Sequence, residues 1–223
     1  MGSCRVHRVG GFWIGDLAPR LSQLSTTLLS DSRERTGAIA PGLLLSLGLT
    51  DGIMVGQALT VVTAAGDNLA VHQALELLEP GHVLVVAAGG STERAIVGEI
   101  MCSYAKGRGC AGMVIDGSVR DAHALGSLGL PVFARGVSHL GPYKNGPGEI
   151  GGAVAVGGVV VESGDAIIGD ADGVVVIPRE RASAVTAAAE LRQANERGVL
   201  QSIADHRYRP DWLEAAIELI ACE

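Results

Sequence analysis

The sequence is poor in aromatic residues and in lysine, and the shortage of lysine limits the catalytic mechanisms that are possible. Aromatic side chains make up 3% of the 223 residues, and the only lysines are Lys106 and Lys144. Neither lysine lies in the kind of apolar segment that activates an amine for Schiff-base formation. Pyridoxal-dependent and lysine-dependent aldolase chemistry are therefore not expected.

Paired cysteines are missing as well. The four cysteines have no CxxC spacing, and the N-terminus lacks a charged segment followed by an apolar run and a cleavage site. We therefore expect a protein of the reducing cytoplasm. The cysteines are Cys4, Cys102, Cys110 and Cys222.

Long apolar runs and an excess of positive charge are also absent. The mean hydropathy is +0.33, yet no stretch approaches the roughly 18 apolar residues that cross a bilayer. A net charge of −7 leaves no basic surface to hold a phosphate backbone. Membranes and nucleic acid are not expected partners, so small molecules or proteins remain.

Several catalytic motifs are missing from the chain. The patterns GxxxxGK[ST], GxSxG and HExxH do not occur, and no GxGxxG follows the first expected strand. Nucleotide-binding, serine-hydrolase and zinc-protease functions are therefore disfavoured.

The residues that are abundant indicate an α/β fold. Glycine (32 residues) punctuates segments rich in Ala, Val, Ile and Leu, a pattern typical of buried strands that alternate with helices. The alternation predicts three successive βαβ units and a largely parallel central sheet, with catalytic groups at the carboxyl ends of its strands. Strands are expected at 55–64, 83–86, 113–115 and 131–134, and helices at 69–78, 94–106 and 121–128.

The flanking segments are expected to complete a single domain. Residues 1–20 form an N-terminal arm that either wraps the surface or reaches a neighbouring subunit, residues 21–178 form the core, and residues 179–223 form C-terminal helices. Glycine-rich hairpins after residue 136 predict a β-layer that closes the sheet. The remaining expected elements are helices at 21–29, 41–47, 179–197 and 211–221, and short strands at 151–156, 159–161, 166–169 and 174–177.

The strongest candidate site follows the strand at 113–115. Residues 116–121 (DGSVRD) contain Arg120, whose guanidinium fork suits an anionic substrate, beside Asp121, whose carboxylate suits a hard cation. The alternative is that Asp121 only caps a helix and Arg120 only pairs with a surface carboxylate. Glu99 lies 21 positions before Arg120, in the helix of the preceding unit, and neighbouring units bring such positions to one edge.

Other polar residues have simpler explanations. His72, in an expected helix, has the right chemistry for proton transfer, but a helix histidine is more often structural. Asp170 and Asp172 flank Ala171 in a spacing that suits calcium, although Asp172-Gly173 is also an ordinary hairpin turn.

These segments together resemble the family named for the regulator of ribonuclease activity A, which includes 4-hydroxy-4-methyl-2-oxoglutarate / 4-carboxy-4-hydroxy-2-oxoadipate aldolases. The likeness extends from about Ser25 to Pro178. The aldolase branch has an acidic residue, twenty intervening residues and then Arg-Asp, which Glu99, Arg120 and Asp121 match, although the family's first position is often Asp. The similar segments are 66–72 (GDNLAVH), 89–90, 95–99, 112–121, 130–136 (LPVFARG) and 164–178.

The resemblance implies a swivelling-domain-like α/β/α sandwich and specific roles for the matched residues. Asp121 would bind Mg²⁺ or Mn²⁺, Arg120 would bind the substrate's oxo and carboxylate oxygens, and Glu99 would deliver a proton through water. The backbone amides from Gly98 to Met101, which include those of Glu99 and Ile100, would receive the substrate carboxylate, as a helix N-terminus can.

The expected function is therefore a class II, divalent-metal-dependent aldolase. It would cleave 4-hydroxy-2-oxo diacids to pyruvate and a second oxo acid, and would decarboxylate oxaloacetate as a side activity. The alternative is a non-catalytic, protein-binding regulator of ribonuclease E. The resemblance also implies a homotrimer or a hexamer with the pocket at subunit boundaries.

Overall fold

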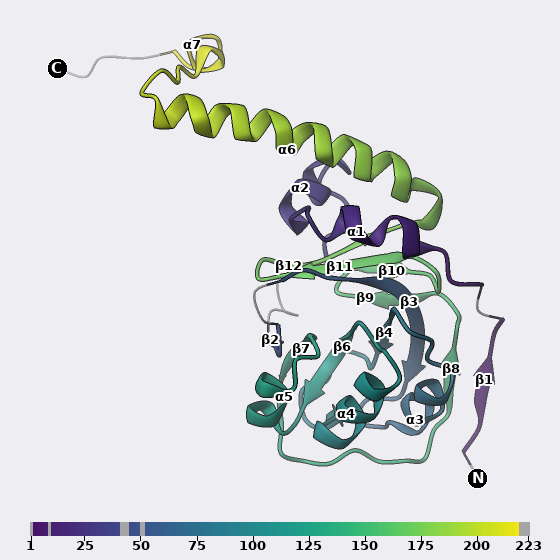
Figure 1. Cartoon of the computed structure of the whole chain (residues 1–223). Helices are drawn as coiled ribbons and strands as arrows, with labels where there is room; N and C mark the ends of the chain where they lie inside the picture. Colours follow the sequence, from purple (N-terminus) through teal and green to yellow (C-terminus); the bar gives the residue numbers. More distant parts are fainter. Residues whose placement is uncertain (1, 9, 41–44, 50–51, 219–223) are drawn as a thin grey trace.

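The computed structural model describes residues 2–8, 10–40, 45–49 and 52–218, and it confirms the α/β class (Figure 1). A large central sheet has the strand order β1-β8-β3-β4-β6-β7-β2. Its middle is parallel, because β3 pairs with β4, β4 with β6, and β6 with β7 in parallel register. These strands are β3 (Met54–Thr63), β4 (His82–Ala87), β6 (Gly112–Val119) and β7 (Val132–Val137).

Crossover connections place three helices on one face of this sheet (Figure 1). Buried aliphatic residues of the strands, such as Leu59 and Ile115, share one core cluster with Val71 of the first helix and Cys102 of the second. The helices are α3 (Leu69–Glu76), α4 (Glu99–Gly107) and α5 (Ala122–Leu128). This layer follows from the predicted βαβ alternation.

The opposite face is covered by hairpins. The hairpin of β9 (Val154–Val156) and β10 (Val159–Val161) forms a separate two-stranded sheet over the core. The hairpin of β11 (Ala166–Asp170) and β12 (Gly173–Ile177) instead joins the central sheet, since β11 pairs antiparallel with β3. The predicted β-layer is therefore only partly separate from the main sheet.

Short N-terminal helices and a long C-terminal helix lie beyond these hairpins (Figure 1). They are η1 (Ile14–Asp16), α1 (Ala18–Leu21), α2 (Thr26–Asp31), η2 (Arg179–Arg181), α6 (Ala182–Ala204) and α7 (Asp211–Ala216). The far half of α6 leaves Leu200 and Ile203 exposed. Despite its 23 residues, α6 is not apolar enough to span a membrane, and no other helix among the described residues is both long and apolar enough.

Several predicted boundaries were wrong; the helix expected over 21–29, for example, is divided between α1 and α2, and strand pairing explains three other cases. Leu45–Leu47 forms β2, antiparallel to β7, instead of the end of a helix over 41–47, of which residues 41–44 lie outside the described residues. The helix expected from residue 94 begins at Glu99, because Ala95–Val97 pairs with β6 as strand β5. Strand β6 also runs on through Asp116 to Val119. In each case pairing with a neighbouring strand overrides a local pattern.

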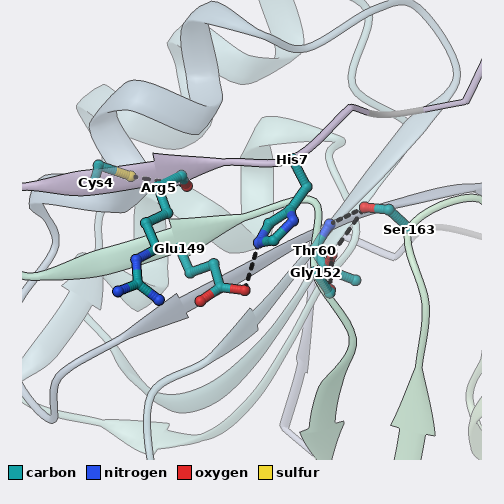
Figure 2. Close-up of polar contacts among 7 residues, drawn as sticks. All are labelled: Cys4, Arg5, His7, Thr60, Glu149, Gly152 and Ser163. Atoms are coloured by element: carbon teal, nitrogen blue, oxygen red, sulfur yellow. Dashed lines mark hydrogen bonds and ion pairs between the residues drawn. The ribbon is translucent and has the colours of Figure 1, made fainter.

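The N-terminal arm wraps the surface of its own chain. Strand β1 (Cys4–Val6) pairs in parallel with β8 (Gly148–Ile150) at one sheet edge. Figure 2 shows His7 bonded to Glu149, with 2.6 Å between His7 Nε2 and Glu149 Oε1. In the same view Thr60 donates to the carbonyl of Gly152 over 2.6 Å and contacts Ser163. Part of the arm and part of the core line an open hollow of about 590 Å³.

Asp170 has a structural role in anchoring α2. Its buried carboxylate accepts hydrogen bonds from the backbone amide (2.8 Å) and the hydroxyl (2.6 Å) of Thr26, at the first turn of that helix. A third bond comes from the amide of Asp172 in the hairpin turn. These three bonds account for the carboxylate of Asp170.

Replacing Asp170 with alanine should therefore lower the free energy of unfolding by about 2–3 kcal/mol, because buried donors of Thr26 lose their acceptor. Urea denaturation measures the change. Asp172→Ala, at an exposed turn position, is the matched control and should stay within about 0.5 kcal/mol of the wild type. Equal stability of the two variants would contradict this role for Asp170.

Candidate active site

The predicted site residues meet where β5 and β6 end. The two strands are parallel neighbours, and Val97 is the register partner of Val119. The amide of Arg120 donates to the carbonyl of Val97 over 3.0 Å. Consequently Gly98 and Glu99, which follow β5, lie beside Arg120 and Asp121, which follow β6. Six residues are thus gathered as the sequence predicted: Gly98, Glu99, Ile100, Met101, Arg120 and Asp121.

Asp121 faces the N-terminus of α4, the helix of the preceding unit. Its backbone is left-handed (φ 59°, ψ 38°), and its side chain makes no capping bond to α5, the helix that it precedes. Instead, Asp121 Oδ2 accepts a hydrogen bond from the amide of Glu99 over 3.0 Å. The simple helix-cap explanation is therefore wrong for the helix that follows, and the carboxylate is fixed across two units of the fold.

Arg120 and Asp121 form a half-exposed pair. The guanidinium Nε lies 3.6 Å from Asp121 Oδ2, and the two side chains are 42% and 41% exposed. At this exposure the attraction adds little to stability. The pairing instead matters for geometry, because it holds a cationic and an anionic group side by side at the surface.

Gly98 makes this arrangement possible through its missing side chain. A Cβ atom there would lie 2.5 Å from Asp121 Oδ2 and 2.7 Å from Cγ of Arg120. Its backbone is extended (φ −148°), so any residue could adopt the conformation. Space, and not backbone freedom, is what requires glycine.

A small cavity of about 30 Å³ opens beside the pair. Arg120 lines it together with Ile100 and Met101 from the first turn of α4. The N-cap residue of α4 is Gly98, which has no side chain to accept hydrogen bonds, so the amides of Ile100 and Met101 in the first turn have no partner within the helix. The amide of Glu99 is already bonded to Asp121, so it does not share the anion-binding role implied for the other amides.

Asn68 also lines this cavity, and sequence reasoning missed it as a site residue. Its side chain is 2% exposed, and Nδ2 donates to the carbonyl of Ile96 over 2.9 Å. Its Oδ1 is buried without a hydrogen-bond partner among the described residues. Such an orphaned acceptor is costly, and a bound hydroxyl or water could satisfy it. Its position after the first parallel strand, in the segment GDN, was the feature of the sequence that could have identified Asn68 as a site residue.

No nearby thiol competes as a nucleophile. Burial, assisted by the neighbouring Cys110 and Asp121, raises the pKa of the Cys102 thiol to about 12. The thiol therefore stays protonated at neutral pH, and the reactive thiolate is not formed.

The fold and the site together define a class of protein. It is a mixed α/β protein in which a helix N-terminus, a guanidinium and a carboxylate meet at the carboxyl edge of parallel strands, where α/β proteins bind ligands. More particularly, the chain belongs to the RraA-like family, because the family model described as Aldolase/RraA matches residues 25–176.

Similar proteins carry several kinds of name, among them aldolase and inhibitor of RNA processing. A protein of Halalkalibacterium halodurans, named "Putative 4-hydroxy-4-methyl-2-oxoglutarate aldolase", is 38% identical over 86% of this chain and 90% of its own length. The solved RNA-processing inhibitor RraA of Thermus thermophilis is 32% identical over 69% of this chain and 92% of its own, with a TM-score of 0.63. The structure of RraAS2 of Streptomyces coelicolor, an unusual member of the RNase ES inhibitor RraA family, is 29% identical over 84% and 98%, with a TM-score of 0.72.

Gly98→Ala should displace the side chains of Arg120 and Asp121 and cost about 1–3 kcal/mol of stability, because the new methyl group overlaps both. A crystal structure and a urea titration measure the two effects. Gly126→Ala is the matched control, since no atom lies within 4 Å of a Cβ there and alanine favours the helix by up to about 1 kcal/mol. Unmoved side chains in Gly98→Ala would contradict the close-packing argument.

Proposed function

We propose that this protein is a divalent-metal-dependent aldolase that cleaves 4-hydroxy-2-oxo acids and releases pyruvate. The observation that supports this most directly is that Arg120 and the first turn of α4 line one cavity, while Asp121 pairs with Arg120 and accepts a hydrogen bond from the amide of Glu99. Membership of a family whose model is described as Aldolase/RraA, and the name of the similar Halalkalibacterium protein, support the same reaction class.

The residues at the site fit Mg²⁺ or Mn²⁺. Asp121 Oδ2 is oriented by the Glu99 amide, whereas Oδ1 has no protein partner among the described residues. The described residues hold no group of three or more His, Cys, Asp or Glu that would enclose a metal. A cation held by Asp121 would thus keep most of its water ligands, as Mg²⁺ commonly does. When bound, such a cation supplies Lewis-acid polarisation of a 2-oxo group.

The chain's own residues bind and orient the substrate. Arg120 presents a guanidinium fork to the carboxylate and 2-oxo oxygens, and the amides of Ile100 and Met101 receive the carboxylate at the positive end of α4. As the C3–C4 bond breaks, the C4 hydroxyl passes its proton through water to the Glu99 carboxylate and becomes a carbonyl, and the electron pair of the broken bond forms the enolate of pyruvate. Arg120 stabilises the negative charge that develops on the enolate oxygen.

Glu99 is the proposed proton donor to the departing enolate. Its amide is fixed by Asp121, and its exposed carboxylate has no hydrogen-bond partner among the described residues. A carboxyl group there can protonate C3 of the enolate through water, which gives pyruvate. Loss of carbon dioxide from oxaloacetate forms the same enolate, so decarboxylation is the proposed side activity.

The site is proposed to be completed by another copy of the chain. The cavity of about 30 Å³ is too small to enclose a whole substrate, and Ile100 at its mouth is 79% exposed. Exposed Leu200 and Trp212 on the C-terminal helices offer apolar surface for contact between subunits. A homotrimer or a hexamer is the proposed assembly.

The alternative is a regulator that binds a ribonuclease of the E type. The similarity to solved RraA structures favours it, and the acidic net charge of −7 would serve a protein surface. The aldolase needs Arg120 and Asp121 for a cation-dependent reaction, whereas a regulator that only binds another protein does not.

The wild-type protein with Mg²⁺ or Mn²⁺ should release pyruvate from 4-hydroxy-4-methyl-2-oxoglutarate and from oxaloacetate, and a chelator should abolish both reactions. Arg120→Ala and Asp121→Ala should each lower kcat about 100-fold or more, since each removes a charge that acts on the transition state. A coupled assay for pyruvate measures the rates.

Arg20→Ala and Glu190→Ala provide the control, because this ion pair is equally exposed (43% and 41%) but lies between α1 and α6. Both variants should keep wild-type turnover. An absence of pyruvate with either metal, together with tight binding to a ribonuclease of the E type, would favour the regulator instead.

Glu99→Gln should lower kcat while it leaves KM nearly unchanged, because the amide cannot exchange a proton but occupies the same space. Steady-state kinetics and solvent deuterium incorporation at C3 of pyruvate measure the effect. Equal losses in kcat and in kcat/KM are the expected signature, and a rise in KM alone would assign Glu99 to substrate binding.

A further inference from the structure

The hairpin of β9 and β10 leaves one strip of the central sheet uncovered. On the face opposite the three helices, Ala58 of β3 packs in one core cluster with Val156 of this hairpin. Farther along β3, the hydroxyl of Thr60 donates to the carbonyl of Gly152, where the chain turns from β8 toward β9 (Figure 2). Two residues later, Val62 is 38% exposed, although β4 and β8 pair with β3 on both sides there. The carboxyl end of β3 is therefore open on this face.

The open hollow of about 590 Å³ lies at this end of β3. It is lined by residues 62–64 of β3 and the turn after it, by residues 147–149 at the start of β8, and by Ser3 and Arg5 of the arm. The volume is in the range of roughly 300–1,000 Å³ that small-molecule pockets occupy. Apolar side chains form part of the lining, namely those of Val62, Ala64 and Pro147. Since α/β proteins bind ligands at the carboxyl ends of parallel strands, the hollow is a second candidate site.

Two opposite charges lie side by side in this hollow. Arg5 of β1 is the register partner of Glu149 of β8, and Glu149 is the register partner of Val62. Register partners on neighbouring strands point to the same face of a sheet, with their Cβ atoms about 5 Å apart. All three residues also line the hollow. A guanidinium, a carboxylate and an apolar side chain can therefore contact one small molecule.

Both charged groups keep hydrogen-bonding capacity for a ligand. Glu149 uses Oε1 for His7, and in Figure 2 no interaction joins Oε2 or the Arg5 guanidinium to the other residues drawn. In the part of the chain that the structure describes, Arg5 forms no ion pair, and Glu149 forms only the one with His7. A guanidinium can bind a carboxylate through two parallel hydrogen bonds, and a carboxylate oxygen accepts hydrogen bonds from an ammonium group. The pair is suited to a ligand that carries both charges.

We propose that the hollow binds a free α-amino acid with an apolar side chain. Arg5 binds the α-carboxylate, Glu149 accepts hydrogen bonds from the α-ammonium group, and the side chain of the ligand packs on Val62 and Pro147. Among the described residues, none lines both this hollow and the cavity beside Arg120, so the proposal does not depend on the proposed aldolase. Because Arg5 belongs to the arm and Val62 to the core, the ligand also ties the arm to the sheet.

Calorimetry with L-leucine and two analogues tests the recognition of both charges. 4-Methylpentanoate lacks the ammonium group of leucine, and 3-methylbutan-1-amine lacks its carboxylate. The wild type should bind leucine more tightly than either analogue by about 10-fold or more, because each analogue loses one charge-assisted contact. If leucine gives no binding heat, or binds no more tightly than either analogue, the proposal is overturned.

Substitutions place the ligand in the hollow. Arg5→Met and Glu149→Gln should each weaken leucine binding about 10-fold or more. Arg8→Met is the matched control, since Arg8 is an exposed arginine of the arm that does not line the hollow, and it should leave binding unchanged. Arg120→Ala should leave binding unchanged too, and a loss there would move leucine to the candidate active site. A loss with Arg5→Met but not with Glu149→Gln would reduce the ligand to a simple carboxylate. Either result overturns the proposal.

Amide hydrogen exchange tests whether the ligand ties the arm to the core. The amide of His7 donates to the carbonyl of Ile150 over 2.9 Å, and the amide of Gly148 donates to the carbonyl of Ser3 over 3.1 Å, so both amides report on the docking of β1. Saturating leucine should slow exchange at both amides about 10-fold or more in the wild type, and it should have no such effect in Arg5→Met. Unchanged exchange in the wild type, despite leucine binding, would place the ligand elsewhere and overturn the proposal.

Discussion

The candidate site depends on one constraint, the parallel pairing of the short strand β5 with the end of β6. This pairing brings the residue after Val97 against the residues after Val119, although some twenty positions separate them in the chain. The contact is so close that any larger residue at position 98 would have to displace the side chains of Arg120 and Asp121. As a result, the N-terminus of one helix and the Arg-Asp pair before the next are rigidly related, and the cavity lies between them.

Charge at this junction is balanced in an unusual way. The positive end of α4 is offset by Asp121, a residue of the following unit, and the same carboxylate is shared with Arg120. Because both side chains are about two-fifths exposed, a small anion and a hydrated cation can each approach without the cost of entering an apolar interior. An arrangement of this kind favours ligand binding over stability.

The part of the chain that matches the family model is distinct from the segments that flank it. Residues 25–176 contain the parallel strands and the site, whereas the arm with β1 and α6 lie outside the matched range. Relatives on this fold are named both as an aldolase and as inhibitors of RNA processing, so the fold alone does not choose between these functions. The chemistry of particular side chains has to decide.

Residue patterns alone determined the α/β class, the parallel strands β3, β4, β6 and β7, and the segment that contains Arg120 and Asp121, because alternating apolar segments and glycine turns are local properties. Tertiary structure decided the rest. Strand β5 and the short β2 exist only through pairing with distant strands, and the orphaned Oδ1 of Asn68 becomes apparent only once α3 and α4 are packed. Only the tertiary structure shows that Asp121 accepts a hydrogen bond from α4 and not from α5. Sequence order indicates the helix that follows a residue, but it does not indicate the helix that packs beside it.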